Sequence, residues 1–238
     1  TSSSDGMILV APVMGGSIKV SKDSGVTWTS VGSSKSWTSI TSSSDGTKLA
    51  AVETSTGVGN IWISSDSGST WEMVGSSKGW TSITSSSDGT YLAATEHFSG
   101  IGNIWTSNNS GTTWREVTSI TSKKRWVSIA SSSDGTKLAA VVRQGNIWTS
   151  SDSGTTWTEH SAGSMESWYS ITSSSDGTKL AAASLNMVEI YGFSILDALA
   201  SLHPQTAQWA TALPPWRADR RASPRATQGT RYRGRLRA

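Results

Sequence analysis

A segment of eight residues recurs four times in this chain at a constant spacing. Its pattern is Ser-x-Asp-x-Gly-x-Thr-Trp, and the copies carry Asp23, Asp66, Asn109 and Asp152 at the third position, so that each copy lies 43 residues after the last. A fixed period of this length predicts one supersecondary unit repeated along the chain. We call this segment the box motif.

The box motif has the composition of a tight turn between two strands. An aspartate there can accept hydrogen bonds from N–H groups of its own loop, and a glycine can adopt a positive φ without steric cost. The tryptophan can bury a large apolar ring against the sheet. Asn109 keeps an oxygen acceptor but has no carboxylate, which favours a structural role over a catalytic one. We expect that role for all four copies, at positions Asp23, Gly25, Trp28, Asp66, Gly68, Trp71, Asn109, Gly111, Trp114, Asp152, Gly154 and Trp157.

The box motif resembles the Asp box, or BNR repeat, of sialidase-type β-propellers. The resemblance covers about 1–194 and implies an all-β fold, a β-propeller of four-stranded antiparallel blades. One repeat of about 43 residues offers four short β-rich segments separated by turns, which is the size of one blade. The expected units are a partial blade 1–36, blades 37–79, 80–125 and 126–167, and a partial blade 168–194.

This inventory amounts to about four and a half blades, or 18 strands. It predicts either an open part of a larger ring or a small ring of about five blades. The chain begins in mid-repeat without an initiator methionine. We therefore expect a fragment or an incomplete gene model, from which targeting and oligomeric state cannot be judged.

The segment 195–238 lacks the repeat and is expected to be a short helix followed by a disordered, arginine-rich region. Residues 217–238 hold eight arginines and one aspartate, a net charge of +7, which leaves −4 for residues 1–216 out of the +3 of the whole chain. Nucleic-acid binding by the repeats is therefore not expected. The tail is either out-of-frame sequence or a basic arm for nucleic acid or anionic lipid.

Composition excludes several kinds of site. The chain has no cysteine, so it has no disulfide, no thiol nucleophile and no cysteine-ligated metal. His97 and His160 are too far apart in sequence to indicate a metal pair, and no cofactor is expected. Of the 13 tryptophans, 11 recur with the repeat, and this periodicity favours packing between blades over stacking on sugars. No apolar run is long enough to span a membrane.

Strand direction assigns the two faces of such a molecule. Successive antiparallel strands alternate direction, so the box turns share one face with the turns between the first and second strands of each blade. The other connections meet on the opposite face, where the resemblance implies the active site of sialidases. The repeats differ from one another there, and variable loops on a rigid scaffold usually carry function. The candidate binding residues are Glu53, Glu96, His97, Lys123, Lys124, Arg125 and Arg143.

The enzyme hypotheses have weak support in these loops. A sialidase needs an arginine cluster and a Tyr/Glu pair, whereas the repeats contain only Arg115, Arg125 and Arg143. A xyloglucanase-like propeller needs two facing carboxylates. Glu53 and Glu96 are the one equivalent pair, and we expect both to be solvated strand ends.

The expected function is therefore non-enzymatic binding of a protein or glycan through this face. A truncated glycoside hydrolase, sialidase- or xyloglucanase-like, and a propeller like the photosystem II assembly factor remain alternatives. The compartment is not determined by the sequence, and the resemblance alone favours an extracellular or lumenal location.

Overall fold

Antiparallel strands make up the regular structure of the chain. The computed structural model describes residues 1–192 apart from 56, 98, 162–165 and 185–187, and no helix occurs among these residues. The helix and the arginine-rich region predicted within 195–238 lie outside the described part. The strands are β1 (Leu9–Ala11), β2 (Met14–Ser21), β3 (Thr29–Ser42), β4 (Leu49–Glu53), β5 (Gly59–Ser64), β6 (Glu72–Lys78), β7 (Trp80–Ser85), β8 (Leu92–Glu96), β9 (Ile104–Ser107), β10 (Arg115–Glu116), β11 (Trp126–Ser131), β12 (Leu138–Gly145), β13 (Ile147–Ser150), β14 (Thr158–His160), β15 (Glu166–Ser173), β16 (Lys179–Ser184) and β17 (Val188–Gly192).

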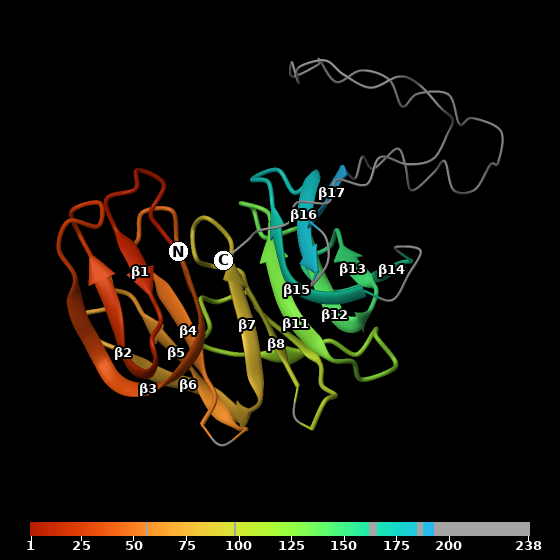
Figure 1. The fold of residues 1–238 in the computed structure, drawn as a ribbon, viewed down its shortest axis with the longest axis horizontal. Coiled ribbons are helices and arrows are strands. Elements are labelled where there is room, and N and C mark those ends of the chain that lie inside the picture. Colours follow the sequence, from red (N-terminus) through yellow and green to blue (C-terminus); the bar gives the residue numbers. More distant parts are fainter. Residues whose placement is uncertain (56, 98, 162–165, 185–187, 193–238) are drawn as a thin grey trace, which may run out of the picture. The chain divides into compact units, whose positions relative to one another are not determined.

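These strands form five successive antiparallel blades (Figure 1). The first blade is β1, β2 and the start of β3, and the second is the end of β3 with β4, β5 and β6. Strands β7–β10 and β11–β14 form the third and fourth blades, and β15–β17 the fifth. The described strands number 17, one fewer than expected, because β3 runs without a break from the first blade into the second.

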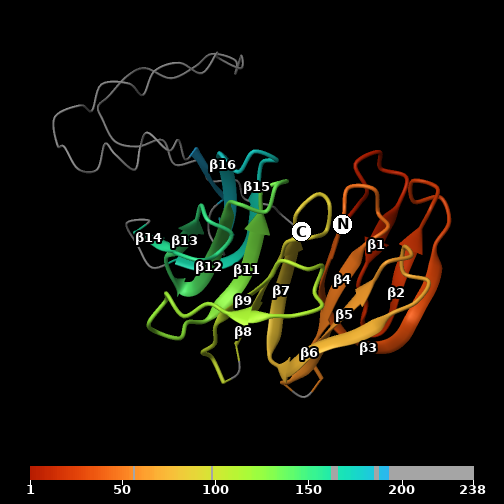
Figure 2. The same cartoon turned by 180° about the vertical axis from the view of Figure 1, so that it is seen from behind.

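The second strand of each blade explains how neighbouring blades pack. In β4, side chains alternate between the two faces of the sheet, so Leu49 and Ala51 join the core shared with the first blade. Ala50 and Val52 join the core shared with the third blade. The same Leu-Ala-Ala sequence begins β8 and β12. The small alanines allow the sheets to approach closely on both sides (Figure 2).

Tryptophans fill the space between blades, as the sequence predicts. Trp37, Trp80, Trp126 and Trp168, the first tryptophans of their blades, are all at most 3% exposed. Each of the first three meets a tryptophan of the third strand edge-on, as in Trp37 against Trp62, with ring centroids 6.2 Å apart. These indoles therefore belong to the core rather than to a sugar-stacking surface, whereas Trp28 of the first blade is exposed.

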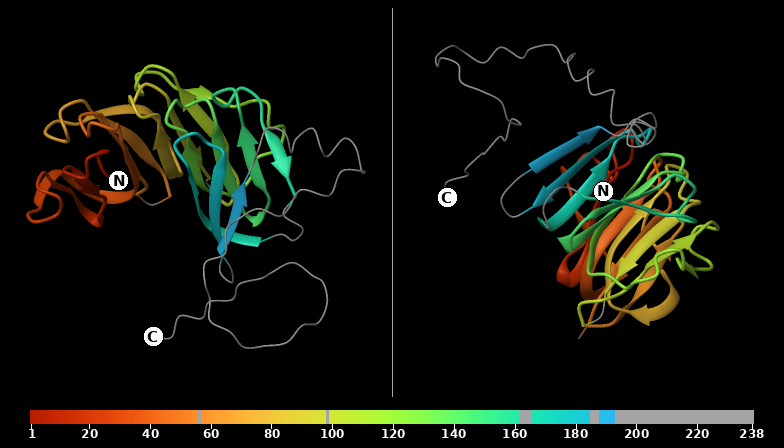
Figure 3. Two further views of the ribbon diagram at one scale, coloured as in Figure 1. Left: turned by 90° about the horizontal axis from the view of Figure 1, so that it is seen from above. Right: turned by 90° about the vertical axis from the view of Figure 1, so that its right-hand side faces the viewer.

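The blades follow one another in sequence order as a partial ring. In Figure 3 (left) the chain runs along an arc from the first blade, in red, to strands β15–β17, in cyan and blue, and no pairing between described strands joins these two ends. The structure thus has the open arrangement, the first of the two alternatives predicted for the repeats. Among the described residues, no helix is long and apolar enough to cross a membrane.

Candidate functional site

The loop that follows the second strand of a blade pairs with the segment that leads out of that blade and with the segment that leads into it. The N–H of Lys124 donates to the carbonyl of Gly102 at 3.0 Å, and the N–H of Gly102 donates back at 2.9 Å. The N–H of Arg143 donates to the carbonyl of Arg125 at 2.9 Å in the next blade. These bonds bring Lys124, Arg125 and Arg143 to one end of the third and fourth blades, where Glu96 and His97 also lie. Glu53 belongs to the second blade and contacts none of them among the described interactions. We call the resulting surface the loop face; it comprises residues 34–36, 53–59, 76–79, 96–102, 121–125 and 143–145, except 56 and 98.

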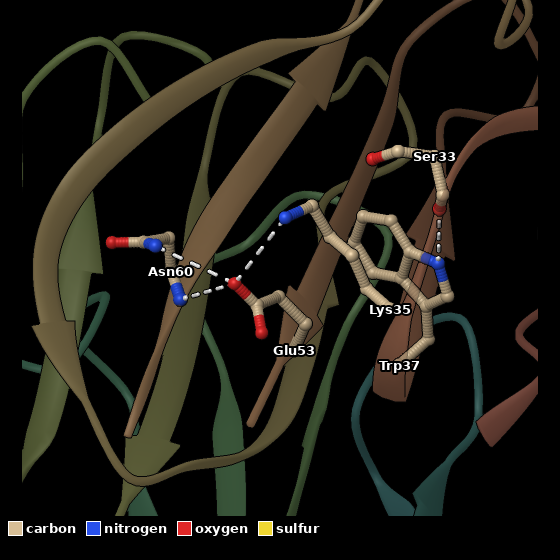
Figure 4. A network of polar contacts seen from close by, with 5 residues as sticks. All are labelled: Ser33, Lys35, Trp37, Glu53 and Asn60. Carbon is tan, nitrogen blue, oxygen red and sulfur yellow. Dashed lines mark hydrogen bonds and ion pairs between the residues drawn. The ribbon is translucent and has the colours of Figure 1, made fainter. Parts of the chain in front are cut away.

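Glu53 is buried, and the expectation of a solvated strand end is wrong for this residue. It is 4% exposed. Its Oε1 accepts hydrogen bonds from the N–H of Asn60 at 3.3 Å and from Asn60 Nδ2 at 3.4 Å, and Lys35 Nζ lies 4.0 Å away (Figure 4). The carboxylate packs against Gly59 and Asn60, where the third strand of the blade begins. It holds the start of the next strand rather than facing solvent.

Glu96 repeats this arrangement in the third blade and corrects the same expectation. It is 8% exposed, and its Oε1 accepts the N–H of Asn103 at 3.2 Å. In both loops a glycine permits the close approach, since a Cβ added at Gly59 or Gly102 would lie 1.9 Å from the carbonyl oxygen of the glutamate. Each carboxylate therefore engages its own blade.

The fourth blade has no such carboxylate. Val142 takes the place of the glutamate opposite the first tryptophan of the blade, and a short turn through Arg143 and Gln144 replaces the longer loop. Gln144 adopts φ +54°. The turn leaves the Arg143 side chain exposed, with its guanidinium carbon 5.8 Å from the centroid of the Tyr169 ring.

A lysine lies over a tryptophan in three successive blades. The distances from ammonium nitrogen to ring centroid are 4.6 Å for Lys35 and Trp62, 4.3 Å for Lys78 and Trp105, and 4.7 Å for Lys124 and Trp148. Such cation–π contacts fix the lysines against the face. Sequence reasoning missed them, although each lysine stands two residues before the first tryptophan of its blade.

Three exposed cations lie on the loop face at the third and fourth blades. Lys123, Arg125 and Arg143 are exposed. His97 is half-buried, and burial lowers its pKa, with the nearby positive charge of Arg125 adding to the effect. The closest outer-strand carboxylates, Glu116 and Glu159, accept hydrogen bonds from the side chains of Asn103 and Asn146. With Glu53 and Glu96 buried, this part of the loop face is suited to an anionic group.

The box turns lie at the other end of the blades and use their polar groups locally. Asp66 accepts the Thr70 N–H at 2.8 Å and the Thr70 hydroxyl at 2.6 Å, and Gly68 adopts φ +83°. Trp71 Nε1 donates to the carbonyl of Gly68 at 3.0 Å. The bonds from Thr70, and a further one from Ser64, lower the pKa of Asp66 to about 2. The copies at Asp23 and Asp152 have the same bonds.

Two hollows open between neighbouring box turns rather than on the loop face. One, of about 350 Å³, lies between the second and third blades, and the other, of about 360 Å³, between the first and second. Lys48 at the first hollow donates to the carbonyl of Asp88 at 2.9 Å. Its ammonium group thereby joins two blades. No group of three or more metal-ligating side chains occurs in the described part of the chain.

Comparison with known proteins identifies the architecture. No protein-family model and no curated protein matches the chain. Among solved structures, the GH74 enzyme of Niastella koreensis superposes with a TM-score of 0.66 at 14% identity, over 83% of this chain and 35% of that one. The Cps50 (Swd1) β-propeller domain of Myceliophteria thermophila gives 0.58 at 15% identity, over 79% and 67%.

YCF48 from Cyanidioschyzon merolae gives a TM-score of 0.59 at 16% identity, over 78% of this chain and 66% of that one. At these identities the likeness shows the fold alone, and the fold is a β-propeller. The chain spans about a third of the length of the GH74 enzyme.

Proposed function

We propose that this partial β-propeller belongs to the Asp-box repeat family and binds a protein or glycan through its loop face without catalysis. The box motifs support the family assignment, because four copies at equal spacing make equivalent turns, three with Asp and one with Asn109. The loop face supports the binding role, because it gathers the segments in which the repeats differ. Asp-box propellers serve several functions, so the ligand has to be inferred from the site.

One observation carries the proposal: the two loop glutamates are buried, whereas Lys123, Arg125 and Arg143 beside them are exposed. Arg125 and Arg143 lie near the half-buried His97, Lys123 is exposed on the same face, and Tyr169 adds an exposed ring. Guanidinium groups bind carboxylates through paired hydrogen bonds. The ligand we infer is a protein segment or glycan that carries carboxylates.

A glycoside hydrolase is the second candidate, favoured by the likeness to GH74 enzymes in fold. Hydrolysis would require two carboxylates that face each other across the substrate. Glu53 and Glu96 instead accept hydrogen bonds from Asn60 and Asn103 within their own loops. This arrangement supports binding over hydrolysis. A role like that of YCF48 is the third candidate. The likeness to YCF48 is in fold alone and identifies no residue of this chain that would carry such a role.

The test measures binding of polyglutamate, polygalacturonate and neutral xyloglucan by calorimetry. We expect one of the acidic polymers to bind, and the variant Lys123→Gln/Arg125→Gln/Arg143→Gln to bind at least about tenfold more weakly. The control Lys22→Gln/Arg115→Gln/Lys179→Gln removes the same charge from exposed positions near the box turns and should bind like the wild type. Binding should weaken with added salt.

Equal losses in both triple variants, or no binding of either acidic polymer, would contradict the proposed site. Release of reducing ends from xyloglucan that is lost in Glu53→Gln/Glu96→Gln would favour the hydrolase instead.

A further inference from the structure

The charges of the loop face are distributed unequally between blades. The connections of the second blade on this face hold one lysine and one glutamate, Lys35 and Glu53, and those of the third blade hold Lys78 and Glu96. The connections of the fourth blade on the same face hold four cationic residues and no carboxylate: Lys123, Lys124, Arg125 and Arg143. Of these three blades, the fourth alone therefore carries a large net positive charge on the loop face.

Val142 occupies the position at which the other two blades have a glutamate. In each blade the first tryptophan pairs with the same position near the end of the second strand, which is Glu53 in the second blade and Glu96 in the third. In the fourth blade this position is Val142, which is 8% exposed and belongs to an apolar core cluster. An apolar side chain thus replaces the buried carboxylate.

The replacement removes the counter-charge of a stacked lysine. In the second blade, Lys35 Nζ lies 4.0 Å from Glu53 Oε1 (Figure 4). In the fourth blade, Lys124 has the equivalent contact with the ring of Trp148, and its ammonium group donates to Ser122 Oγ at 3.2 Å. Within the described part of the chain, no carboxylate lies within ion-pair distance of Lys124. Lys124 therefore keeps the ring contact of Lys35 without its ion pair.

The ammonium group of Lys124 is held in position and retains hydrogen-bond donors. Two backbone hydrogen bonds with Gly102 fix the main chain of this half-buried lysine. The ring of Trp148 and the hydroxyl of Ser122 then fix its head group. An ammonium group has three N–H donors, and Ser122 accepts one of them. The remaining donors can bind a carboxylate without the loss of an ion pair, which a ligand would have to displace at Lys35.

The nearest carboxylates of the chain are engaged elsewhere. Glu159, on the outer strand of the fourth blade, accepts a hydrogen bond from Asn146 Nδ2 at 2.9 Å. Glu96, at the neighbouring edge of the third blade, is buried and accepts the N–H of Asn103 at 3.2 Å. Both acidic groups are thus held by asparagines of their own blades. The positive charge of the fourth blade is left for a ligand.

We infer that the anion-binding centre of the loop face lies in the fourth blade, where Lys124 binds a carboxylate of the ligand and Val142 leaves that lysine without a counter-charge. The inference rests on the binding role proposed above and adds these two residues to it. Arg125 and Arg143 bind further carboxylates of the same ligand. The second and third blades, which retain the glutamate, contribute little to anion binding.

The test titrates polyglutamate and polygalacturonate, in separate experiments, into variants of the full chain by calorimetry. Lys124→Gln should bind the polymer that the wild type binds at least about fivefold more weakly. Lys124→Arg, which keeps the charge, should bind within about twofold of the wild type. Lys78→Gln, the equivalent change in the third blade, should weaken binding clearly less than Lys124→Gln. Lys179→Gln, at an exposed position near the box turns, should bind like the wild type.

Substitution of Val142 tests why the charge of Lys124 is unbalanced. Val142→Glu places a carboxylate where the second and third blades have one, so it should weaken binding about as much as Lys124→Gln. Val142→Gln, which is similar in shape but neutral, should weaken binding much less. Thermal melts establish that both variants fold. Because a change at a buried position can unfold the blade, Glu96→Gln supplies a second measurement: it removes a neighbouring negative charge and should strengthen binding.

The outcomes separate this inference from the binding role on which it rests. Loss of binding in Lys123→Gln/Arg125→Gln/Arg143→Gln, together with full binding in Lys124→Gln, would overturn the inference and leave the binding role intact. Equal losses in Lys124→Gln and Lys78→Gln, or in the two folded Val142 variants, would also overturn it. A wild type that binds neither polymer would contradict both proposals.

Discussion

At the residue scale, Asp66 and Asn109 close equivalent box turns with different chemistry. Asp66 accepts both the N–H and the hydroxyl of Thr70. Asn109 accepts the N–H of Thr113 at 2.9 Å, while its amide nitrogen donates to the Thr113 hydroxyl at 2.8 Å. We therefore expect Asp66→Asn to melt close to the wild type and Asp66→Ala to melt several degrees lower, in thermal scans by circular dichroism. Equal losses in the two variants would mean that the charge, rather than the acceptor, holds the turn.

At the scale of the element, Gly59 allows the backbone at the start of β5 to lie close to the backbone at the end of β4. A side chain there would meet the Glu53 backbone, which cannot rotate away, so Gly59→Ala should separate Glu53 from Asn60. The expected loss of stability is about 1–3 kcal/mol, measured by urea denaturation. Val58→Ala, in the same loop but 39% exposed, should cost much less. A Gly59→Ala protein as stable as this control would show that the loop adapts freely.

At the scale of the molecule, the repeat places two kinds of acid-sensitive turn along the array: the box turns and the turns between the first and second strands of each blade. Hydrogen bonds from neighbouring Ser and Thr groups lower the aspartate pKa values to about 2 from an ordinary 3.8 at Asp23, Asp45, Asp66, Asp88 and Asp134. Between pH 3.8 and pH 2 the unfolded chain binds more protons than the native one. The contribution of these carboxylates to the free energy of unfolding is therefore fully present above about pH 4 and is lost as the pH falls toward 2. The melting midpoint should be flat near neutrality and fall steeply below pH 4.

The control for this acid transition is Asp66→Asn, which removes one titrating turn without removing its acceptor. Its melting midpoint should fall less between pH 4 and pH 2 than that of the wild type. A wild-type midpoint that is unchanged down to pH 2 would contradict the assignment of the lowered pKa values to the native turns.

The fold could be predicted from the sequence, because the features that specify it are local and recur in every repeat. The spacing of the box motif, the Leu-Ala-Ala strands and the periodic tryptophans specify blades, because turn geometry and strand alternation depend on neighbours in sequence. Tertiary structure alone decided the burial of Glu53 and Glu96. A strand-end glutamate has the same sequence signature whether its carboxylate faces solvent or packs against its own blade, and here Gly59 and Gly102 allow the close packing. The lysines stacked on tryptophans and the approach of Arg125 and Arg143 to His97 likewise arise from contacts between segments distant in sequence.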